Sequence, residues 1–264
     1  MSDSGVIVEL AEVAKTYVSP GGAETRVLRG VDLRIGTGES VAIVGPSGCG
    51  KSTLLKVMIG LAPPLGGRVL FDGVDMVTAQ GAERLALLRK FGVMYQSGAL
   101  FGSMNLLENV RLPLDEFTRL EIEERHLVAL TKLNQVGLLE AARRMPAELS
   151  GGMQKRAGIA RAMALDPGIL FLDEPSAGLD PITSAGLDRL IRELSRSFGI
   201  TFVVVTHELQ SIFAIADRCI MLDAKRRTII AEGKPADLRD HSRDPAVRQF
   251  FRREAEPEAE RGTG

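Results

Sequence analysis

The sequence has few cysteines, no long apolar run and almost no excess of charge. Its 264 residues include only two cysteines, Cys49 and Cys219, which are too few and too differently placed for a disulfide framework. So few cysteines are typical of a protein that works in a reducing cytosol. Lysine and arginine together number 33 against 34 acidic residues, so the overall charge gives no indication of nucleic-acid binding.

Segments for membrane insertion are also missing. No apolar stretch approaches the ~18 residues that a spanning helix needs, and the first five residues lack the basic flank and apolar region of a signal peptide. Contact with a membrane is therefore expected only through partner proteins. Apolar residues make up 45% of the chain, enough for the core of one substantial α/β domain with a smaller appendage.

The most informative segment is residues 45–53, which read GPSGCGKST. It fits the pattern G-x-x-x-x-G-K-[ST], with Gly45, Gly50, Lys51 and Ser52 at the fixed positions. The glycines let backbone N–H groups face phosphate oxygens, the lysine supplies a positive charge for the β/γ-phosphates, and the serine hydroxyl can bind Mg²⁺. The other residues expected to line this loop are Pro46, Ser47, Gly48, Cys49 and Thr53.

The surroundings of this loop support the motif. Residues 41–44 are apolar and predict a buried parallel strand, and residues 53–59 predict a helix whose N-terminal dipole favours an anion. A chance glycine-rich turn is the alternative, and this strand–loop–helix context makes it the weaker one. The segment therefore predicts binding of a nucleoside triphosphate.

A second signal is the apolar run at residues 169–172 followed by Asp173 and Glu174. A strand that ends in carboxylates delivers them to the sheet edge where α/β proteins bind ligands. Asp173 can hold Mg²⁺, and Glu174 can polarise the attacking water. The alternative is an ordinary strand that ends in a solvated acidic pair, but the phosphate loop upstream favours catalysis.

A third signal is residues 149–152, LSGG, followed by a helical run at 153–165. Ser150 is a suitable N-cap, and Gly151 and Gly152 leave their amides accessible, which suits a second phosphate-binding helix terminus. For these residues alone, a simple capped helix is the better explanation.

Elsewhere the pattern predicts strands alternating with helices. Strands are expected at residues 6–13, 28–35, 68–71, 201–205 and 219–222. Residues 108–149 are more polar and show apolar residues at three- and four-residue intervals, which predicts helices. The chain is therefore expected to have a parallel-sheet core interrupted by a helical insertion.

Together these motifs resemble those of the ABC ATPases, and they occur in that family's order over residues 8–237. The residues that carry the resemblance are the phosphate loop, Gln96, residues 149–152, Asp173, Glu174, residues 177–180 (AGLD) and His207. The resemblance implies an α/β fold with a P-loop NTPase sheet, an antiparallel β subdomain and a helical insertion. It places one ATPase domain at 6–240, with the insertion at about 97–165. A C-terminal segment is expected at 241–253, and the charged residues 254–264, nearly devoid of apolar side chains, are expected to form a disordered tail.

The resemblance also implies a mechanism. Two copies would pack head to tail, each ATP lying with Mg²⁺ between one phosphate loop and residues 150–152 of the other copy. Asp180 would act across the dimer interface, and Gln96 would report the nucleotide state to a membrane partner. One departure is visible, because the glutamine that usually follows the second glycine is replaced by Met153, with Gln154 next.

Three side chains have weaker interpretations of their own. Tyr17 can stack on adenine through its ring face, or can be a half-buried residue of an edge strand. Gln96 can bind the metal or orient water through its amide. His207 can contact the γ-phosphate, although a lone histidine is more often structural.

Further segments resemble the ATPase subunits of bacterial phospholipid transporters of the Mla type, which maintain outer-membrane lipid asymmetry. They are residues 95–101, 105–109, 180–183 and 244–251, together with Met153. That resemblance implies a peripheral protein on the cytoplasmic face of the bacterial inner membrane, working with a multispan permease and an Mce-domain lipid-binding protein. Val247, Phe250 and Phe251 would then contact a neighbouring subunit, or close the chain's own core.

Three other roles share these catalytic motifs. A polar-solute importer ATPase should carry Ser-Gly-Gly-Gln, and a cassette of the cell-division type would signal or scaffold rather than transport. A soluble cassette that acts on DNA or ribosomes is the least favoured, because the chain has neither a long coiled-coil insertion nor a second cassette.

Overall fold

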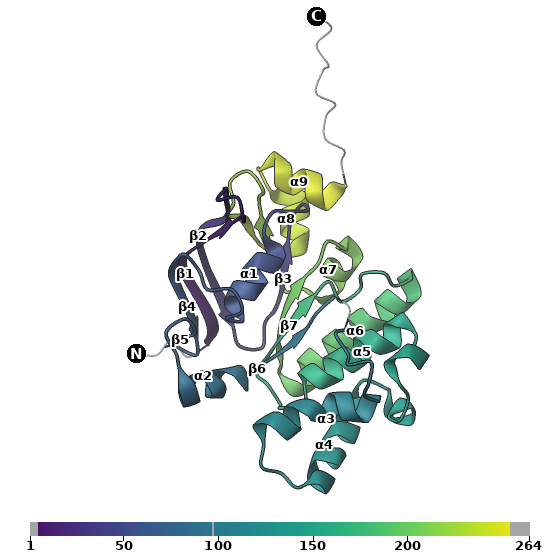
Figure 1. Ribbon diagram of the computed structural model, residues 1–264. Coiled ribbons are helices and arrows are strands. Elements are labelled where there is room, and N and C mark those ends of the chain that lie inside the picture. Colours follow the sequence, from purple (N-terminus) through teal and green to yellow (C-terminus); the bar gives the residue numbers. More distant parts are fainter. Residues whose placement is uncertain (1–4, 97, 254–264) are drawn as a thin grey trace, which may run out of the picture.

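The computed structural model describes residues 5–96 and 98–253, and the expected tail at 254–264 lies outside this part (Figure 1). Its centre is a six-stranded sheet with the strand order β10-β9-β3-β8-β7-β6. Strands β9 to β6 run parallel, and β10 pairs antiparallel with β9. The strands are β3 (Ser40–Val44), β6 (Phe91–Met94), β7 (Ile169–Asp173), β8 (Thr201–Val205), β9 (Arg218–Leu222) and β10 (Ile229–Gly233).

A second sheet is antiparallel and has the order β2-β1-β4-β5. Its strands are β1 (Val6–Val18), β2 (Glu24–Gly36), β4 (Gly66–Phe71) and β5 (Val74–Asp75). A turn at residues 19–22 (SPGG) connects β1 and β2, and there the N–H of Gly22 donates to the carbonyl of Ser19 at 2.9 Å. The expected antiparallel subdomain is therefore present beside the parallel core.

The two faces of the central sheet build separate cores, because side chains alternate along each strand. On β7, Ile169 and Phe171 pack with helix α1 (Lys51–Met58) and the antiparallel sheet. Leu170 and Leu172 face the other way, toward the helices of the second core. Figure 1 shows α1 between the two sheets, with α3 to α6 grouped beyond the central sheet.

The helices are stabilised by caps that the sequence makes recognisable. Ser150, Asp180 and Asn105 each accept a hydrogen bond from a backbone N–H in the first turn of the following helix. The remaining α-helices are α2 (Gly81–Leu88), α3 (Leu106–Phe117), α4 (Ile122–Gln135), α5 (Gly151–Ala162), α6 (Pro181–Phe198), α7 (Leu209–Ile215), α8 (Pro235–His241) and α9 (Pro245–Arg252). Two short 3₁₀ turns lie at Leu139–Ala141 and Pro146–Glu148.

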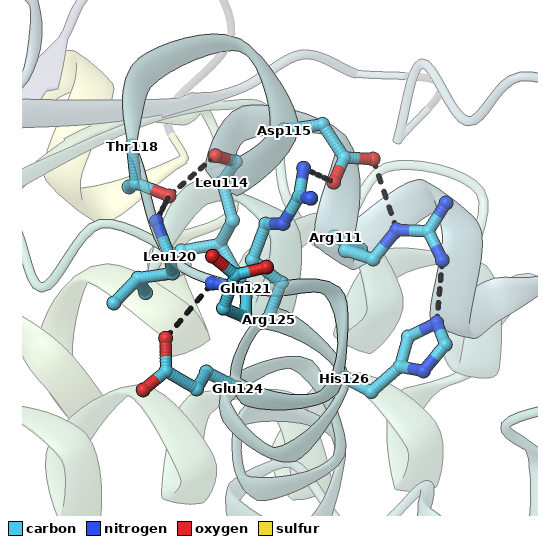
Figure 2. Close-up of polar contacts among 9 residues, drawn as sticks. All are labelled: Arg111, Leu114, Asp115, Thr118, Leu120, Glu121, Glu124, Arg125 and His126. Carbon is cyan, nitrogen blue, oxygen red and sulfur yellow. Dashed lines mark hydrogen bonds and ion pairs between the residues drawn. The ribbon is translucent and has the colours of Figure 1, made fainter.

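Helices α3 and α4 are joined at one end by a polar cluster (Figure 2). Asp115 accepts hydrogen bonds from Arg111 at 2.9 Å and from Arg125 at 2.7 Å, and Arg111 also contacts His126. The turn between the helices is closed by Thr118, whose hydroxyl donates to the carbonyl of Leu114 at 2.7 Å. One carboxylate therefore links the two helices of this hairpin.

The C-terminal helix closes the chain's own core. Val247 and Phe251 of α9 are buried against Ile212 and Met221, and the ring of Phe251 meets that of Phe213 edge-on. Of the two roles considered for this segment, these contacts favour the intramolecular one. Phe250 is only partly buried.

The structure also contains elements that the sequence did not predict. Strand β6 has only four residues, strand β10 is at the edge of its sheet, and helix α2 is short. Among the residues that the structure describes, no helix combines the length and the apolar character required to cross a bilayer.

Candidate active site

The phosphate loop connects β3 to α1 at the carboxyl end of the parallel strands. Gly45 has a φ of 143°, and a Cβ there would lie 2.4 Å from the carbonyl oxygen of Leu222, so only glycine fits. The ammonium of Lys51 donates to the carbonyls of Gly45 at 2.9 Å and Pro46 at 3.1 Å. The lysine therefore arches back over the loop, where its charge reaches a bound phosphate.

The outer part of the loop is open to solvent. Pro46, Ser47 and Gly48 are exposed, whereas the side chain of Cys49 is buried beside Gly45. Burial raises the pKa of the Cys49 thiol. Cys49 therefore faces the interior and offers only its backbone to a nucleotide, and Thr53 follows within the first turn of α1.

Ser52 and Asp173 come together from opposite ends of the sequence. The Ser52 hydroxyl donates to Oδ1 of Asp173 at 3.3 Å, across 121 residues. Burial raises the pKa of Asp173, the Ser52 hydrogen bond opposes this, and Glu174 adds to it. The pair presents a hydroxyl and a partly desolvated carboxylate, hard oxygen donors of the kind that Mg²⁺ prefers.

Glu174 lies directly after β7, and its side chain meets His207 at the end of β8. Nδ1 of His207 lies 2.9 Å from Oε1 of Glu174, while Oε2 is buried without a hydrogen-bond partner in the described part of the chain. An unsatisfied buried carboxylate oxygen marks a place where a water molecule can donate a proton. The arrangement suits a general base that is oriented by a histidine.

Gln96 lies beside this pair because β6 and β7 are neighbours, with Met94 opposite Leu172. It is exposed and lines a cavity of about 630 Å³ together with Asp173, Lys56 and Lys155. The structure therefore brings the loop after β6 (the Gln96 loop, residues 96 and 98–101) next to the carboxylates at the end of β7.

Tyr17 lies near the end of β1, opposite Thr25 of β2, and is 42% exposed. The ammonium of Lys15 lies 5.2 Å from the centre of its ring. Strand β2 itself approaches the phosphate loop, since a Cβ on Gly50 would lie 3.0 Å from the side chain of Val27. This exposure fits both interpretations of Tyr17, a ring accessible for stacking and a half-buried strand residue.

The residues of the LSGG segment lie on the other face of the sheet. Ser150 caps α5 by accepting from the N–H of Met153 at 3.3 Å, and Gly151 is exposed. Gly152 packs against α6, where a Cβ would lie 2.4 Å from the side chain of Thr183. Helix α5 packs in the second core and α1 in the first, but Gly151 of this segment and Lys56 of α1 line the same cavity.

The displaced glutamine has a definite structural contact. The carboxamide of Gln154 donates to the carbonyls of Pro146 at 3.0 Å and Leu149 at 3.4 Å. Met153 is partly buried against the second core. Gln154 therefore fixes the approach to the LSGG segment, and its amide is directed at the protein backbone.

Asp180 starts α6 and accepts from the N–H groups of Ile182 and Thr183, both at 3.0 Å. Hydrogen bonds from Thr183 lower the pKa of this exposed carboxylate. Asp180 therefore has a capping function within its own chain, and its exposure leaves it accessible to a second molecule.

Two cations near the site were missed by the sequence interpretation. Lys155 donates to the carbonyls of Gln96 and Glu174, and Arg161 donates to those of Gly98 and Ala99. The available signal was a pair of basic residues within the apolar, small-residue stretch of α5. Periodicity alone does not show which loop such residues contact.

Known proteins are similar to this chain in sequence and in fold. The ABC transporter family model matches residues 28–177. The intermembrane phospholipid transport system ATP-binding protein MlaF of Escherichia coli is 44% identical over 222 residues, which cover 84% of this chain and 81% of that protein. The probable ribonucleotide transport ATP-binding protein mkl of Mycobacterium leprae is 39% identical over 247 residues, 94% of this chain and 69% of that protein.

Solved structures give the same assignment of fold. A post-hydrolysis dimer of the ATP-binding cassette MJ0796, bound to ADP and Pi, has a TM-score of 0.78 and 36% identity. That match covers 86% of this chain and 98% of the other. The cbiO1 protein of Clostridium perfringens, part of the ABC transporter complex cbiONQ, has a TM-score of 0.78 and 28% identity, covering 89% of this chain and 90% of that one.

Proposed function

We propose that this chain, which belongs to the ABC transporter family and hydrolyses ATP to ADP and phosphate, powers phospholipid transport as a homodimer. The main support for the catalytic role is that two side-chain pairs, Ser52–Asp173 and Glu174–His207, lie close to the phosphate loop. The cargo is proposed from the similarity to MlaF.

ATP is proposed to bind with its phosphates on the backbone of residues 45–53, with Lys51 beside the β/γ-phosphates and Tyr17 against the adenine. Ser52, Asp173 and Gln96 would hold Mg²⁺, and the oxygen atoms of Ser52 and Asp173 already face each other. The ion would supply positive charge to the β- and γ-phosphate oxygens during phosphoryl transfer. A cation there would also offset the burial of the Asp173 carboxylate.

Hydrolysis is proposed to use Glu174 as the general base. His207 holds one carboxylate oxygen, which leaves Oε2 to accept a proton from the attacking water. His207 is itself more than half exposed, so its other ring nitrogen is accessible to the γ-phosphate. The two residues would thus orient the water and contact the phosphate from the ends of neighbouring strands.

The proposed dimer is supported by the exposure of the LSGG segment. Ser150 and Gly151 are exposed, so they would be accessible to a nucleotide held by another molecule. The related cassette MJ0796 is described as dimeric. Asp180 would lie at the same interface.

Coupling to a multispan permease is proposed to occur at the Gln96 loop. Phe101 in this loop is 51% exposed, and the guanidinium of Arg161 lies over its ring. An exposed aromatic residue held in place by a cation is a suitable anchor for a partner helix. The protein would then act at the cytoplasmic face of the bacterial inner membrane, with an Mce-domain protein delivering or receiving the lipid.

A second candidate cargo is a polar solute. The relative mkl, described as a probable ribonucleotide transport protein, aligns with 94% of this chain, a larger share than MlaF does. An ATPase of the cell-division type is a further alternative, because it would use the same catalytic residues without moving a cargo.

Co-purification distinguishes between these proposed cargoes and partners. The full chain, tagged and extracted from its own membranes with detergent, should carry a multispan permease, an Mce-domain protein and phospholipid, all identified by mass spectrometry. A solute permease or a division protein in their place would overturn the lipid assignment. The variant Phe101→Asp should lose the permease, whereas Leu127→Asp, which changes an even more exposed apolar residue of α4, should retain it.

A further inference from the structure

Lys155 is a buried lysine at the centre of the site. It lies three residues after Gly152 on α5 and is only 6% exposed. Its ammonium donates to two main-chain carbonyls, those of Gln96 and, at 3.3 Å, Glu174. Burial lowers the pKa of Lys155, while the nearby carboxylates of Glu174 and Asp173 oppose that effect.

The two carbonyls belong to adjacent strand ends. Gln96 follows β6 and Glu174 follows β7, which pair in parallel with Met94 opposite Leu172. Helix α5 packs on the face of the sheet that forms the second core, so the ammonium of Lys155 reaches the ends of both strands. The same helix begins at the LSGG segment and therefore connects three parts of the site.

The Gln96 loop is attached to α5 at further points. The guanidinium of Arg161 donates to the carbonyls of Ala99 at 2.7 Å and Gly98 at 3.2 Å. Gly158 allows the loop to approach closely, because a Cβ there would lie 3.2 Å from the Cα of Gly98. The loop and the helix are therefore expected to move together.

Glu174 has a backbone conformation that needs support. Its φ is 49°, in the left-handed region, which is unfavourable for a non-glycine residue because its Cβ approaches the following carbonyl oxygen. The N–H of Glu174 donates to Val205 at 2.8 Å, and its carbonyl accepts from Ala177 at 3.2 Å and from Lys155. Without Lys155, one of the three main-chain hydrogen bonds that hold this conformation is lost.

We infer that Lys155 is a positioning residue for ATP hydrolysis: its ammonium fastens the Gln96 loop to the backbone of the general base, so that a shift of either α5 or the loop displaces the Glu174 carboxylate. The inference rests on the proposed role of Glu174. Lys155 would thereby connect the Gln96 loop, where a permease is proposed to bind, with the LSGG segment and with the base that acts on the attacking water.

The variant Lys155→Met tests this connection, because methionine keeps the length and loses the charge and donors. In the full chain with MgATP, kcat should fall about tenfold or more, the usual effect of a misplaced catalytic group. The affinity for ADP and the KM for ATP should stay within about twofold, since Lys155 makes no contact with the phosphate loop in the described structure.

Lys132→Met is the matched control. Lys132 lies on α4, is 5% exposed and pairs with Asp166, not with the carboxylates Asp173 and Glu174 of the site. It should lose thermal stability but keep kcat. Unchanged kcat in Lys155→Met would overturn the inference, and so would a loss of ADP binding that accounts for the whole loss of turnover.

Lys155→Arg provides the second readout. Arginine keeps the charge and the donors, so it should restore turnover to within about threefold of the wild type. Turnover in a folded Lys155→Arg protein that is as low as in Lys155→Met would show that the hydrogen bonds of Lys155 are not what the site requires.

These outcomes separate the inference from the proposed function. A folded Lys155→Arg protein whose kcat falls by more than about tenfold contradicts the role of Lys155, even where Lys155→Met does not fold. If Glu174→Gln abolishes turnover and Lys155→Met does not change it, only the inference fails. If Glu174→Gln hydrolyses ATP normally, the proposed role of Glu174 fails as well.

Discussion

Nδ1 of His207 lies 2.9 Å from Oε1 of Glu174, although 33 residues separate them in the sequence. The contact forms because Glu174 follows β7 and His207 follows β8, which are neighbours in the parallel sheet. It fixes one oxygen of the carboxylate, while the other is buried and has no hydrogen-bond partner among the residues that the structure describes.

Replacing His207 by alanine should lower kcat by about 10- to 100-fold, a common cost of removing a group that orients another. The carboxylate remains able to accept a proton but loses its fixed orientation. Steady-state hydrolysis of ATP and the Kd for ADP measure the two effects, and the Kd should change little. His241→Ala, at an exposed position on α8, should leave both values unaltered. Full activity in His207→Ala would contradict the orienting role.

Asp173→Asn should stabilise the nucleotide-free protein at pH 7 while abolishing metal-dependent turnover. Burial raises the folded-state pKa of Asp173, so the ionised carboxylate costs free energy in the folded state. The stabilising contribution of a group with a raised pKa is present below its unfolded pKa and is lost as pH rises through the folded pKa. The difference in Tm between variant and wild type should therefore be largest at neutral pH.

The pH dependence supplies the check on that prediction. At about pH 4, near the unfolded pKa of an aspartate, the wild-type side chain is partly protonated, so the difference between the two Tm values should be smaller than at pH 7. Thermal denaturation at pH 7 and pH 4 without nucleotide measures this. A variant that is less stable than wild type at pH 7 would show that Asp173 contributes favourably as a carboxylate.

Asp115→Ala should destabilise the α3–α4 hairpin by about 1–3 kcal/mol, because it leaves two partly buried guanidinium groups without their shared carboxylate. Chemical denaturation measures the change in the free energy of unfolding. Lys90→Ala removes a pair with Asp72 that is nearly half exposed, so it should cost at most about 1 kcal/mol. Equal effects of the two variants would contradict the linking role of Asp115.

The sequence predicted the parts of the site that local pattern determines. Residues 45–53 and 169–174 were assigned correctly to a loop before a helix and to a strand end, because glycine spacing and an apolar run are visible in the chain itself. The fold class was also correct, since the order of the motifs is characteristic of one family.

What the sequence could not provide was contact between distant segments. Strand β6 was missed because it has four residues and contains a glycine, yet it positions Gln96 beside Asp173. Lys155 was missed because its role depends on how α5 crosses two strand ends. Similarly, only the packing of Val247 and Phe251 showed that α9 closes its own core.

The central claim is that Glu174 is the base of an ATPase that works as a pair of copies, and Glu174→Gln tests it most directly. Glutamine keeps the shape of the side chain but cannot accept a proton, so kcat should fall by about 10²–10⁴-fold. ATP should still bind, and light scattering after size-exclusion chromatography should show a dimer that depends on ATP. Hydrolysis at the wild-type rate, or a protein that remains monomeric with ATP bound, would contradict the account.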